Sequence, residues 1–123
     1  MTLNQVTVAV SDIRRAREFY LRLGLELIVS TDHYARFFCA GGSTFSIHLE
    51  PAVTPGSTII YFEHADLDER VAALKAAGIT FESDPTDQRW LWREARLIDP
   101  DGNRLCLYFG GENRVNPPWR VQP

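Results

Sequence analysis

Apolar and polar residues alternate along this chain in short runs of two different periods. Every second residue of 6–10 is valine, a period of two that predicts a half-buried strand. Apolar side chains then recur at helical spacing from Ala16 to Leu23, and Gly24 ends the predicted helix. The same order of strand, helix and glycine returns at 58–78. The pattern therefore predicts two similar units in one chain.

Each unit is predicted to follow the order β-α-β-β-β. Strands are expected at 6–10, 25–30, 34–39 and 44–50 in the first unit, and at 58–63, 79–82, 93–98 and 104–109 in the second, whose helix spans 66–77. A loop at 83–92 and a turn at 99–103 complete the second unit. The boundaries follow as module one at 3–50, a linker at 51–57, module two at 58–110 and an irregular tail at 111–123.

The two units also agree residue by residue at their helices. Asp12 and Gly24 recur 54 residues later as Asp66 and Gly78, and both aspartates are predicted helix N-caps. A solenoid needs three or more repeats, whereas two copies make a pseudo-symmetric domain. We therefore predict an α+β fold in which two tandem βαβββ modules form a cupped mixed sheet within a single domain, with a ligand site on the axis between them.

Composition and charge narrow the class of protein. With 123 residues, of which 45% are hydrophobic, the chain is expected to form one globular domain. A net charge of −3 with acids and bases mixed argues against nucleic acid as a partner. No long apolar stretch or signal peptide is present, so neither a membrane span nor secretion is expected. Cys39 and Cys106 lie far apart without a CxxC motif, which fits a reducing cytoplasm.

One face of each predicted sheet must take its helix, which leaves the opposite face free. In 44–50 and 104–109 the apolar positions belong to the helix face. If the two sheets cup around one space, the remaining side chains that line it are Gln5, Thr7, His48, Glu50, Ile59, Tyr61, Cys106 and Tyr108. A concave hollow that is partly polar and partly aromatic is the usual form of a small-molecule site.

Two further strands add charged side chains to this free face. Alternation places Arg36 there, and also Glu94 and Arg96. Arg36 is a candidate for holding a carboxylate or phosphate of a ligand. Trp90 and Trp92 stand at the end of the predicted loop, where they indicate a lid over the cavity, a dimer contact or ordinary packing.

Two segments resemble the opening and closing signatures of the vicinal oxygen chelate superfamily, namely NQVTVAVSDIRRAREFYLRLGLEL and LIDPDGNRLCLYF. That group includes glyoxalase I, bleomycin-resistance proteins, fosfomycin-resistance enzymes, methylmalonyl-CoA epimerase and extradiol dioxygenases, and the similarity spans residues 3–109. The resemblance implies the paired βαβββ fold, a small-molecule ligand and a homodimer with cavities completed near the subunit interface. It does not fix one activity, because a fold hosts many.

Metalloenzymes of that superfamily hold a divalent ion with one residue from each of four strands. The resemblance places these positions at Gln5, His48, Ile59 and Cys106. Ile59 cannot bind a metal, and an amide, an imidazole and a thiol are a poor set for Mg²⁺ or Mn²⁺. We therefore expect no resident metal, and the alternative is an altered zinc, nickel, manganese or iron site of Gln5, His48 and Cys106.

The candidate catalytic residues are His48, Glu50 and Cys106, each with a simpler alternative. His48 can be a hydrogen-bonded strand histidine, Glu50 a solvated strand end and Cys106 a small buried hydrophobe. Gln5 also admits a simpler explanation, the satisfaction of a backbone group at a strand end.

Three functions of different class remain open. The first is a glyoxalase-like lyase or isomerase that binds a small organic ligand, anionic or aromatic, with an altered or absent metal. The second is a metal-free protein that sequesters its ligand, like the bleomycin-resistance members. The third is a metal-dependent dioxygenase. Trp119 in the tail suggests an arm that reaches a partner subunit or the rim of the cavity.

Overall fold

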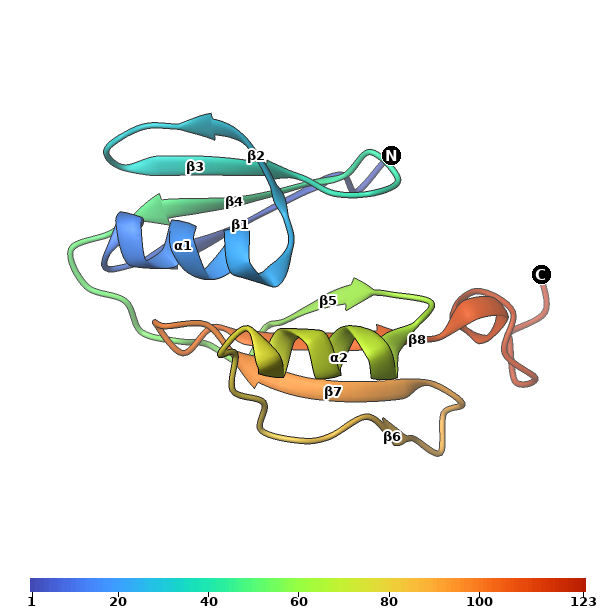
Figure 1. The fold of residues 1–123 in the computed structure, drawn as a ribbon. Coiled ribbons are helices and arrows are strands. Elements are labelled where there is room, and N and C mark those ends of the chain that lie inside the picture. The colour runs from blue at the N-terminus through green and yellow to red at the C-terminus, as the bar shows by residue number, and fades with distance from the viewer. The chain divides into compact units, whose positions relative to one another are not determined.

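The computed structural model describes residues 1–123, which divide into two compact units (Figure 1). The first unit comprises residues 1–56 and 99–103, and the second comprises 57–98 and 104–123. Each unit has one α-helix and one four-stranded mixed sheet. The predicted α+β fold of two tandem βαβββ modules is therefore confirmed. That the modules line one shared cavity stays a prediction.

Module one is built from four strands and a helix in the predicted order. The elements are β1 (Gln5–Val10), α1 (Ile13–Leu23), β2 (Glu26–Ser30), β3 (Tyr34–Phe38) and β4 (Thr44–Leu49). Across the sheet the order is β1-β4-β3-β2, with β1 parallel to β4 and the other pairs antiparallel.

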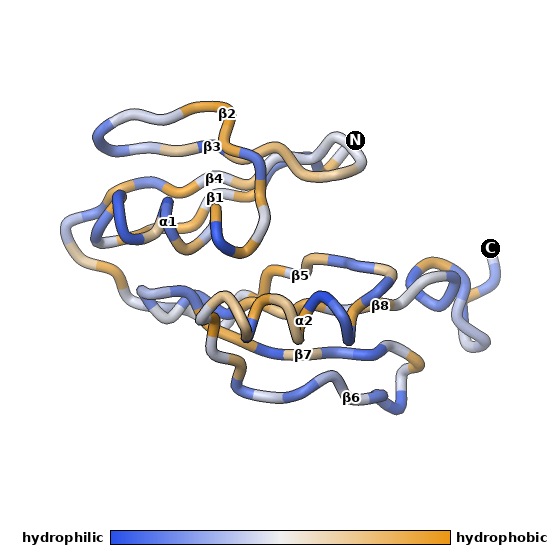
Figure 2. The backbone as a smooth tube through the Cα atoms, viewed as in Figure 1, coloured by the Kyte–Doolittle hydropathy of each residue, from blue (hydrophilic) through white to orange (hydrophobic).

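Module two repeats this arrangement. Its elements are β5 (Ile59–Glu63), α2 (Leu67–Ala76), β6 (Thr86–Asp87), β7 (Arg93–Ile98) and β8 (Arg104–Phe109). The sheet order is β5-β8-β7-β6, and β5 runs parallel to β8. The stretch around β6 is largely hydrophilic in Figure 2.

The core of module one forms between α1 and the sheet. Tyr20 of α1 is fully buried, and its ring lies 4.7 Å from that of Phe45 and 5.9 Å from that of Phe37. Burial of such large rings dominates the stability of a small core. In module two the corresponding buried side chains are smaller and aliphatic, and they are Leu67, Val71, Leu74, Ala95, Leu97, Leu105 and Leu107.

The two predicted N-caps differ in the structure. The Asp12 carboxylate accepts the Arg15 N–H at 2.9 Å, which confirms it as the cap of α1. Asp66 occupies the equivalent position of α2, but its side chain makes no capping hydrogen bond, so that prediction was wrong. Its backbone, with φ −101° and ψ 59°, departs from the extended geometry of Asp12. Its N–H donates instead to His64 Nδ1 at 3.1 Å.

The predicted strand at 79–82 is absent, and β6 (Thr86–Asp87) lies inside the predicted loop. Glu82 N–H still donates to the Arg96 carbonyl at 2.7 Å, as a strand residue would. The next ladder bond is replaced, because Ser83 Oγ accepts the Arg96 N–H at 2.9 Å. A side-chain oxygen that competes in this way ends backbone pairing.

The predicted turn at 99–103 is present and belongs to the first unit. Asp99 is buried there, where its carboxylate accepts the N–H groups of Asp101 and Asn103, both at 2.9 Å. The same carboxylate accepts the Tyr20 hydroxyl at 2.7 Å. Burial raises the pKa of Tyr20, and the charge of Asp99 adds to this effect. The turn thus completes the core around α1.

The tail after β8 begins with a short 3₁₀-helix, η1 (Gly111–Arg114). The Glu63 carboxylate at the end of β5 fixes its start by accepting the N–H groups of Gly110 and Gly111, both at 2.9 Å. The prediction of an irregular tail from residue 111 was therefore wrong for 111–114, whereas the residues beyond form no helix or strand, as predicted, and Trp119 among them is exposed. Neither α-helix of the molecule has the length and apolarity that crossing a bilayer would require.

Candidate functional site

The face of the module-one sheet opposite α1 is polar, as predicted. Strand register aligns Thr7 of β1, Ser46 of β4 and Arg36 of β3 in one row across the sheet. The next row aligns His48 with Tyr34. We call this surface the open face of module one.

Tyr34 is the centre of a hydrogen-bonded cluster on this face. Its hydroxyl lies 2.7 Å from Ser46 Oγ and accepts the Arg36 Nε–H at 2.9 Å. Burial acts to raise the pKa of Tyr34, but its hydrogen bonds with Ser46 and Arg36 outweigh this effect and lower it. The sequence pattern did not single out Tyr34 as a site residue, although its position two residues before Arg36 puts both on one face.

Arg36 forms no ion pair with an acidic side chain. Its Nε is committed to Tyr34, and its guanidinium carbon lies 5.4 Å from the centre of the Tyr34 ring. The two terminal nitrogens of the guanidinium are left to bind an anion, which an arginine fork does well.

His48 of β4 forms a pair with Glu50, the residue that follows the strand. His48 Nδ1 lies 2.9 Å from Glu50 Oε1, and the two side chains are 46% and 44% exposed. The His33 ring contacts that of His48 edge-on at 6.3 Å. A carboxylate that fixes one imidazole nitrogen orients the other toward a reacting group, so this pair has the geometry for proton transfer.

The two predicted site residues of β1 make fewer contacts with other side chains. Gln5 Oε1 accepts the Thr44 hydroxyl at 2.7 Å, and its side chain also contacts the Tyr34 hydroxyl. Thr7 is exposed on the open face. Both are therefore placed to contact a ligand on this sheet.

The equivalent open face of module two is aromatic. The ring of Tyr61 lies 5.8 Å from that of Trp92 and 5.4 Å from that of Tyr108, edge-on in both cases. The rings of Trp92 and Tyr108 are 4.6 Å apart. We call these three residues the aromatic cluster. Trp92 thus packs on the sheet, as in the ordinary-packing interpretation, and its indole N–H donates to the Asn113 carbonyl at 3.3 Å.

A buried carboxylate lies beside the aromatic cluster. Glu94 is 2% exposed, and its two oxygens accept the Trp90 indole N–H and an Arg96 Nη2–H, both at 2.9 Å. Arg96 Nη2 also lies 3.5 Å from the Tyr61 hydroxyl. The hydrogen bond with Glu94 raises the pKa of Arg96. A series of hydrogen bonds therefore holds the arginine in one position, and it runs from Trp90 through Glu94 and Arg96 to Tyr61.

Cys106 lies in the middle of this face and is fully buried. Burial raises the pKa of its thiol to about 12, and the charge of Glu94 contributes in the same direction. The thiolate, which is the nucleophilic and metal-binding form, is therefore scarce at neutral pH. This favours the buried-hydrophobe interpretation of Cys106 over the catalytic one.

The residues at the four chelating positions do not fit a divalent metal. Ile59 offers only hydrocarbon, Cys106 keeps its proton, and the amide oxygen of Gln5 already accepts a hydrogen bond. No group of three or more His, Cys, Asp or Glu side chains converges as metal ligands do. Catalysis through a bound metal therefore gains no support from these donors.

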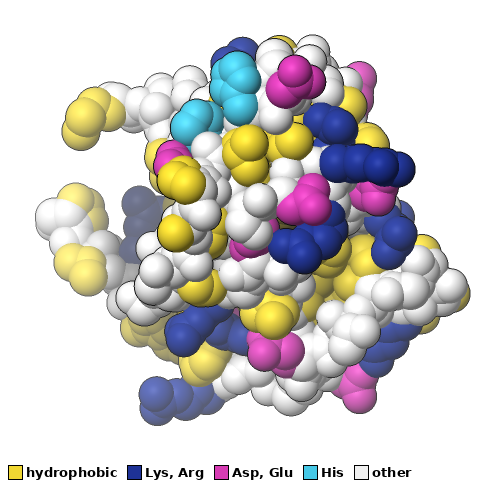
Figure 3. Space-filling model, turned by 90° about the vertical axis from the view of Figure 1, so that its left-hand side faces the viewer, with side chains coloured by type: hydrophobic (Ala, Val, Ile, Leu, Met, Phe, Trp, Pro, Cys, Tyr) yellow, Lys and Arg dark blue, Asp and Glu magenta, His cyan; other side chains and the backbone are white.

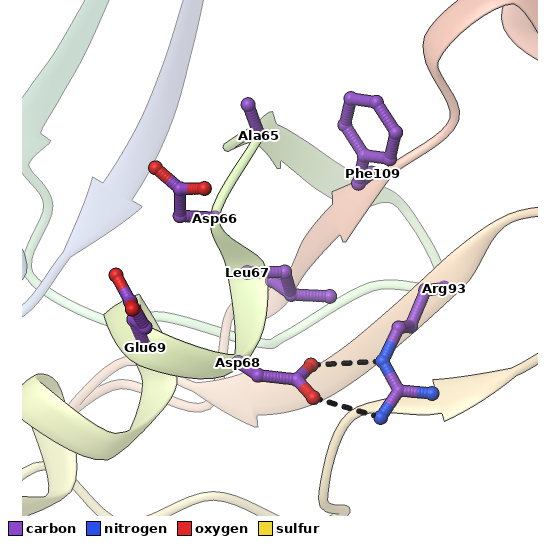
Figure 4. Close-up of a pocket in the computed structure, with 7 residues that line it drawn as sticks. All are labelled: Ala65, Asp66, Leu67, Asp68, Glu69, Arg93 and Phe109. Atoms are coloured by element: carbon purple, nitrogen blue, oxygen red, sulfur yellow. Dashed lines mark hydrogen bonds and ion pairs between the residues drawn. The ribbon is translucent and has the colours of Figure 1, made fainter.

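A separate open pocket of about 300 Å³ lies at the start of α2 (Figure 4), where the sequence predicted no site. Arg93 and Asp68 face one another there and form two hydrogen bonds, at 2.8 and 3.0 Å. A third bond joins Arg93 to Asp87 at 3.0 Å. Because its nitrogens are shared between two carboxylates, Arg93 is a structural group. Elsewhere, acidic and basic side chains intermingle on the surface seen in Figure 3.

Solved structures with this fold include enzymes and binding proteins. A superfamily member from Sphaerobacter thermophilus is 26% identical, with a TM-score of 0.75 over 89% of this chain and 97% of that one. A lactoylglutathione lyase from Agrobacterium tumefaciens is 20% identical (TM-score 0.73; 89% and 93% covered). A bleomycin-binding protein in complex with bleomycin is 22% identical (TM-score 0.74; 90% and 99% covered).

No curated protein matches the chain. Residues 2–107, in contrast, match the profile of the family described as Glyoxalase/Bleomycin resistance protein/Dioxygenase superfamily. This match covers both modules and agrees with the two open-faced mixed sheets. The chain therefore belongs to the glyoxalase/bleomycin resistance protein/dioxygenase superfamily.

Proposed function

We propose that this protein binds a small organic anion on the open faces of its sheets, without a chelated metal ion. Similar structures include a lyase and a binding protein in complex with its ligand, which supports a small-molecule ligand for this protein. The proposal is carried by Arg36, a positively charged side chain that is held in place by a neutral hydroxyl and has no acidic partner.

The side chains at the four chelating positions support binding without a metal ion. In the arrangement that the resemblance implies, a carboxylate would stand at Cys106 both to bind the ion and to act as base. A buried thiol with a pKa of about 12 does neither at neutral pH. Ligand recognition is then left to hydrogen bonds, charge and aromatic contact, which the open faces supply.

Arg36 is proposed as the main contact to the anion. Its fork is planar and partly preorganised by Tyr34, so little side-chain entropy is lost when an oxyanion binds. Gln5, Thr7 and His48 surround it as hydrogen-bonding groups. Glu50, which pairs with His48, excludes a second anion from that end of the strand.

The test measures binding and metal content together. Protein purified without a chelating column should contain well under one metal ion per chain by mass spectrometry. Binding of inorganic phosphate and acetate, followed by NMR, should survive treatment with a chelator. Arg36→Gln should weaken it about tenfold or more, as the loss of a charge-assisted hydrogen bond predicts. Arg22→Gln on α1 removes the same charge elsewhere and should change little.

Two outcomes would contradict the proposal. A stoichiometric metal that disappears in His48→Ala would indicate an altered metal site. Turnover of a hemithioacetal that is lost in the same variant would indicate a glyoxalase-like lyase, with the His48–Glu50 pair as its proton-transfer group.

A further inference from the structure

The two modules carry an arginine at equivalent positions. Arg36 of β3 pairs with Ser46 of β4, and Arg96 of β7 pairs with Cys106 of β8. In both modules these two strands are the antiparallel central pair of the sheet. Each arginine lies on the open face and is held by the side chain two residues before it. The duplication has thus kept the same arrangement twice.

The partners of the two arginines differ in charge. Arg36 is held by a neutral phenol, whereas Arg96 is held by the buried carboxylate of Glu94. Both oxygens of Glu94 are used, one by Arg96 and one by Trp90. The carboxylate therefore fixes the guanidinium and offsets its charge, so that recognition at Arg96 depends more on geometry and on neighbouring groups.

Arg96 keeps N–H donors that its contacts within the protein do not use. Its contacts with Glu94 and Tyr61 both use Nη2, which leaves the Nε and Nη1 donors for another acceptor. The side chain is 37% exposed. Nε and Nη1 lie on opposite edges of the guanidinium and form no fork, so Nη1 offers a carboxylate one N–H, and the Tyr61 hydroxyl, which accepts from Nη2, keeps its own proton for the second oxygen.

Aromatic rings stand next to Arg96. Tyr61 is 40% exposed, and its hydroxyl approaches Arg96 while its ring contacts Trp92 and Tyr108. Edge-on and offset contacts are the favoured geometries for a further ring. Module one has no comparable cluster on its open face, where Thr7 takes the place of Tyr61 in the repeat.

We propose that the open face of module two is a subsite for an aryl carboxylate, in which Arg96 receives the carboxylate and the aromatic cluster receives the ring. This inference rests on the proposed function, because it names the class of ligand that the sheet binds. Glu94 acts as a positioning residue for Arg96.

Sodium benzoate is the probe, and cyclohexanecarboxylate is its control with the same charge and similar bulk but no aromatic ring. The ¹⁵N-labelled full chain is titrated with each, and the three indole N–H signals are followed. Those of Trp90 and Trp92 should shift with benzoate, whereas that of Trp119 in the exposed tail should not. Benzoate should bind about fivefold more tightly than the control, as expected for one added aromatic contact.

Matched variants assign the subsite to its residues. Arg96→Lys keeps a cation beside Glu94 but loses the separate Nη1 and Nη2 donors of the planar guanidinium, and it should weaken benzoate binding about tenfold. Arg22→Gln on α1, which removes the same charge away from the open faces, should leave benzoate binding unchanged. Trp92→Leu should remove the preference for benzoate over cyclohexanecarboxylate. The melting temperature of each variant is measured to confirm that it is folded.

Three outcomes would overturn the inference. They are equal affinity for the two acids, equal losses in Arg96→Lys and Arg22→Gln, and a shift of the Trp119 signal as large as that of Trp92. Failure of the proposed function looks different, because it is detected as bound metal or as phosphate binding that ignores Arg36.

Discussion

At the scale of single residues, the open faces show how neighbours decide the chemistry of a side chain. Ser46 and Cys106 occupy equivalent positions in the two sheets, and both are fully buried. Ser46 supports a tyrosine whose pKa is lowered, whereas Cys106 lies beside a carboxylate that helps raise its own pKa. Two residues of similar size at equivalent positions therefore take part in opposite pKa shifts, one in a neighbour and one in its own thiol.

Cys106 is expected to resist alkylation. At pH 8, iodoacetamide should modify Cys39, which is only partly buried, well before Cys106, and mass spectrometry of peptides measures both. The pKa of Cys39 is also raised by burial, so accessibility decides the order of reaction. Faster labelling of Cys106 in the native protein would contradict its assignment as a buried, protonated thiol.

The raised pKa of Cys106 predicts that the folded state loses stability in alkali. The folded state holds the Cys106 proton more tightly than the unfolded state, so its contribution is complete below the ordinary pKa of 9.0. That contribution is lost as the pH rises from 9.0 to about 12. Urea unfolding over this range should show a shallower decline in Cys106→Ala than in the unaltered protein.

At the scale of elements, the two helices are anchored in different ways. A side-chain cap begins α1, and its buried face carries Tyr20. No side-chain cap begins α2, where acidic residues in the first turn, Asp68 and Glu69, provide favourable charge near the N-terminus. Asp68 is also tied to Arg93 by two hydrogen bonds. Helix α2 is thus held by its side chains to β7.

Replacing Asp12 and Asp66 distinguishes the two ways in which the helices are anchored. Asp12→Ala should lower the free energy of unfolding by about 1 kcal/mol, the usual value of an N-cap. Asp66→Ala removes no capping bond and should cost much less. Chemical denaturation of both variants measures the difference. Equal losses would mean that Asp66 caps α2 in solution.

Periodicity predicted the strands and helices that have one apolar face, because burial enforces that pattern. It failed at 79–82, where the Ser83 side chain replaces a ladder bond, and at Asp66, where backbone dihedral angles decide the cap. The predicted open faces include Arg36 and Glu94, since alternation fixes the side of a strand. Alternation does not specify pairing across strands, so it did not identify Tyr34 as the partner of Arg36.

At the scale of the whole molecule, the duplicated modules have diverged in what their open faces present. One is polar and carries a cation without an acidic partner, and the other is aromatic around a neutralised arginine. Residues 51–57, predicted as a linker, join the two units without forming a helix or strand. The sequence repeat predicted the common architecture, but the specialisation of each face comes from residues that do not repeat.

Self-association belongs to this scale and remains a prediction. We expect a homodimer by light scattering, with the exposed Trp119 of the tail contributing to the contact. Trp119→Ser should then shift the equilibrium toward monomer, whereas Arg22→Gln on α1 should not. A monomer at every concentration tested would end this expectation.

The turn at 99–103 affects whether the two halves of the chain can fold separately. Its residues reach Tyr20, Ser11 and the backbone of Ala9, although the strands on either side of it belong to the second unit. A fragment that ends at the linker would leave the Tyr20 hydroxyl buried without its acceptor. The first half of the chain therefore no longer contains all of its own core. We expect that neither half of the present chain folds by itself into a module like the ancestral one.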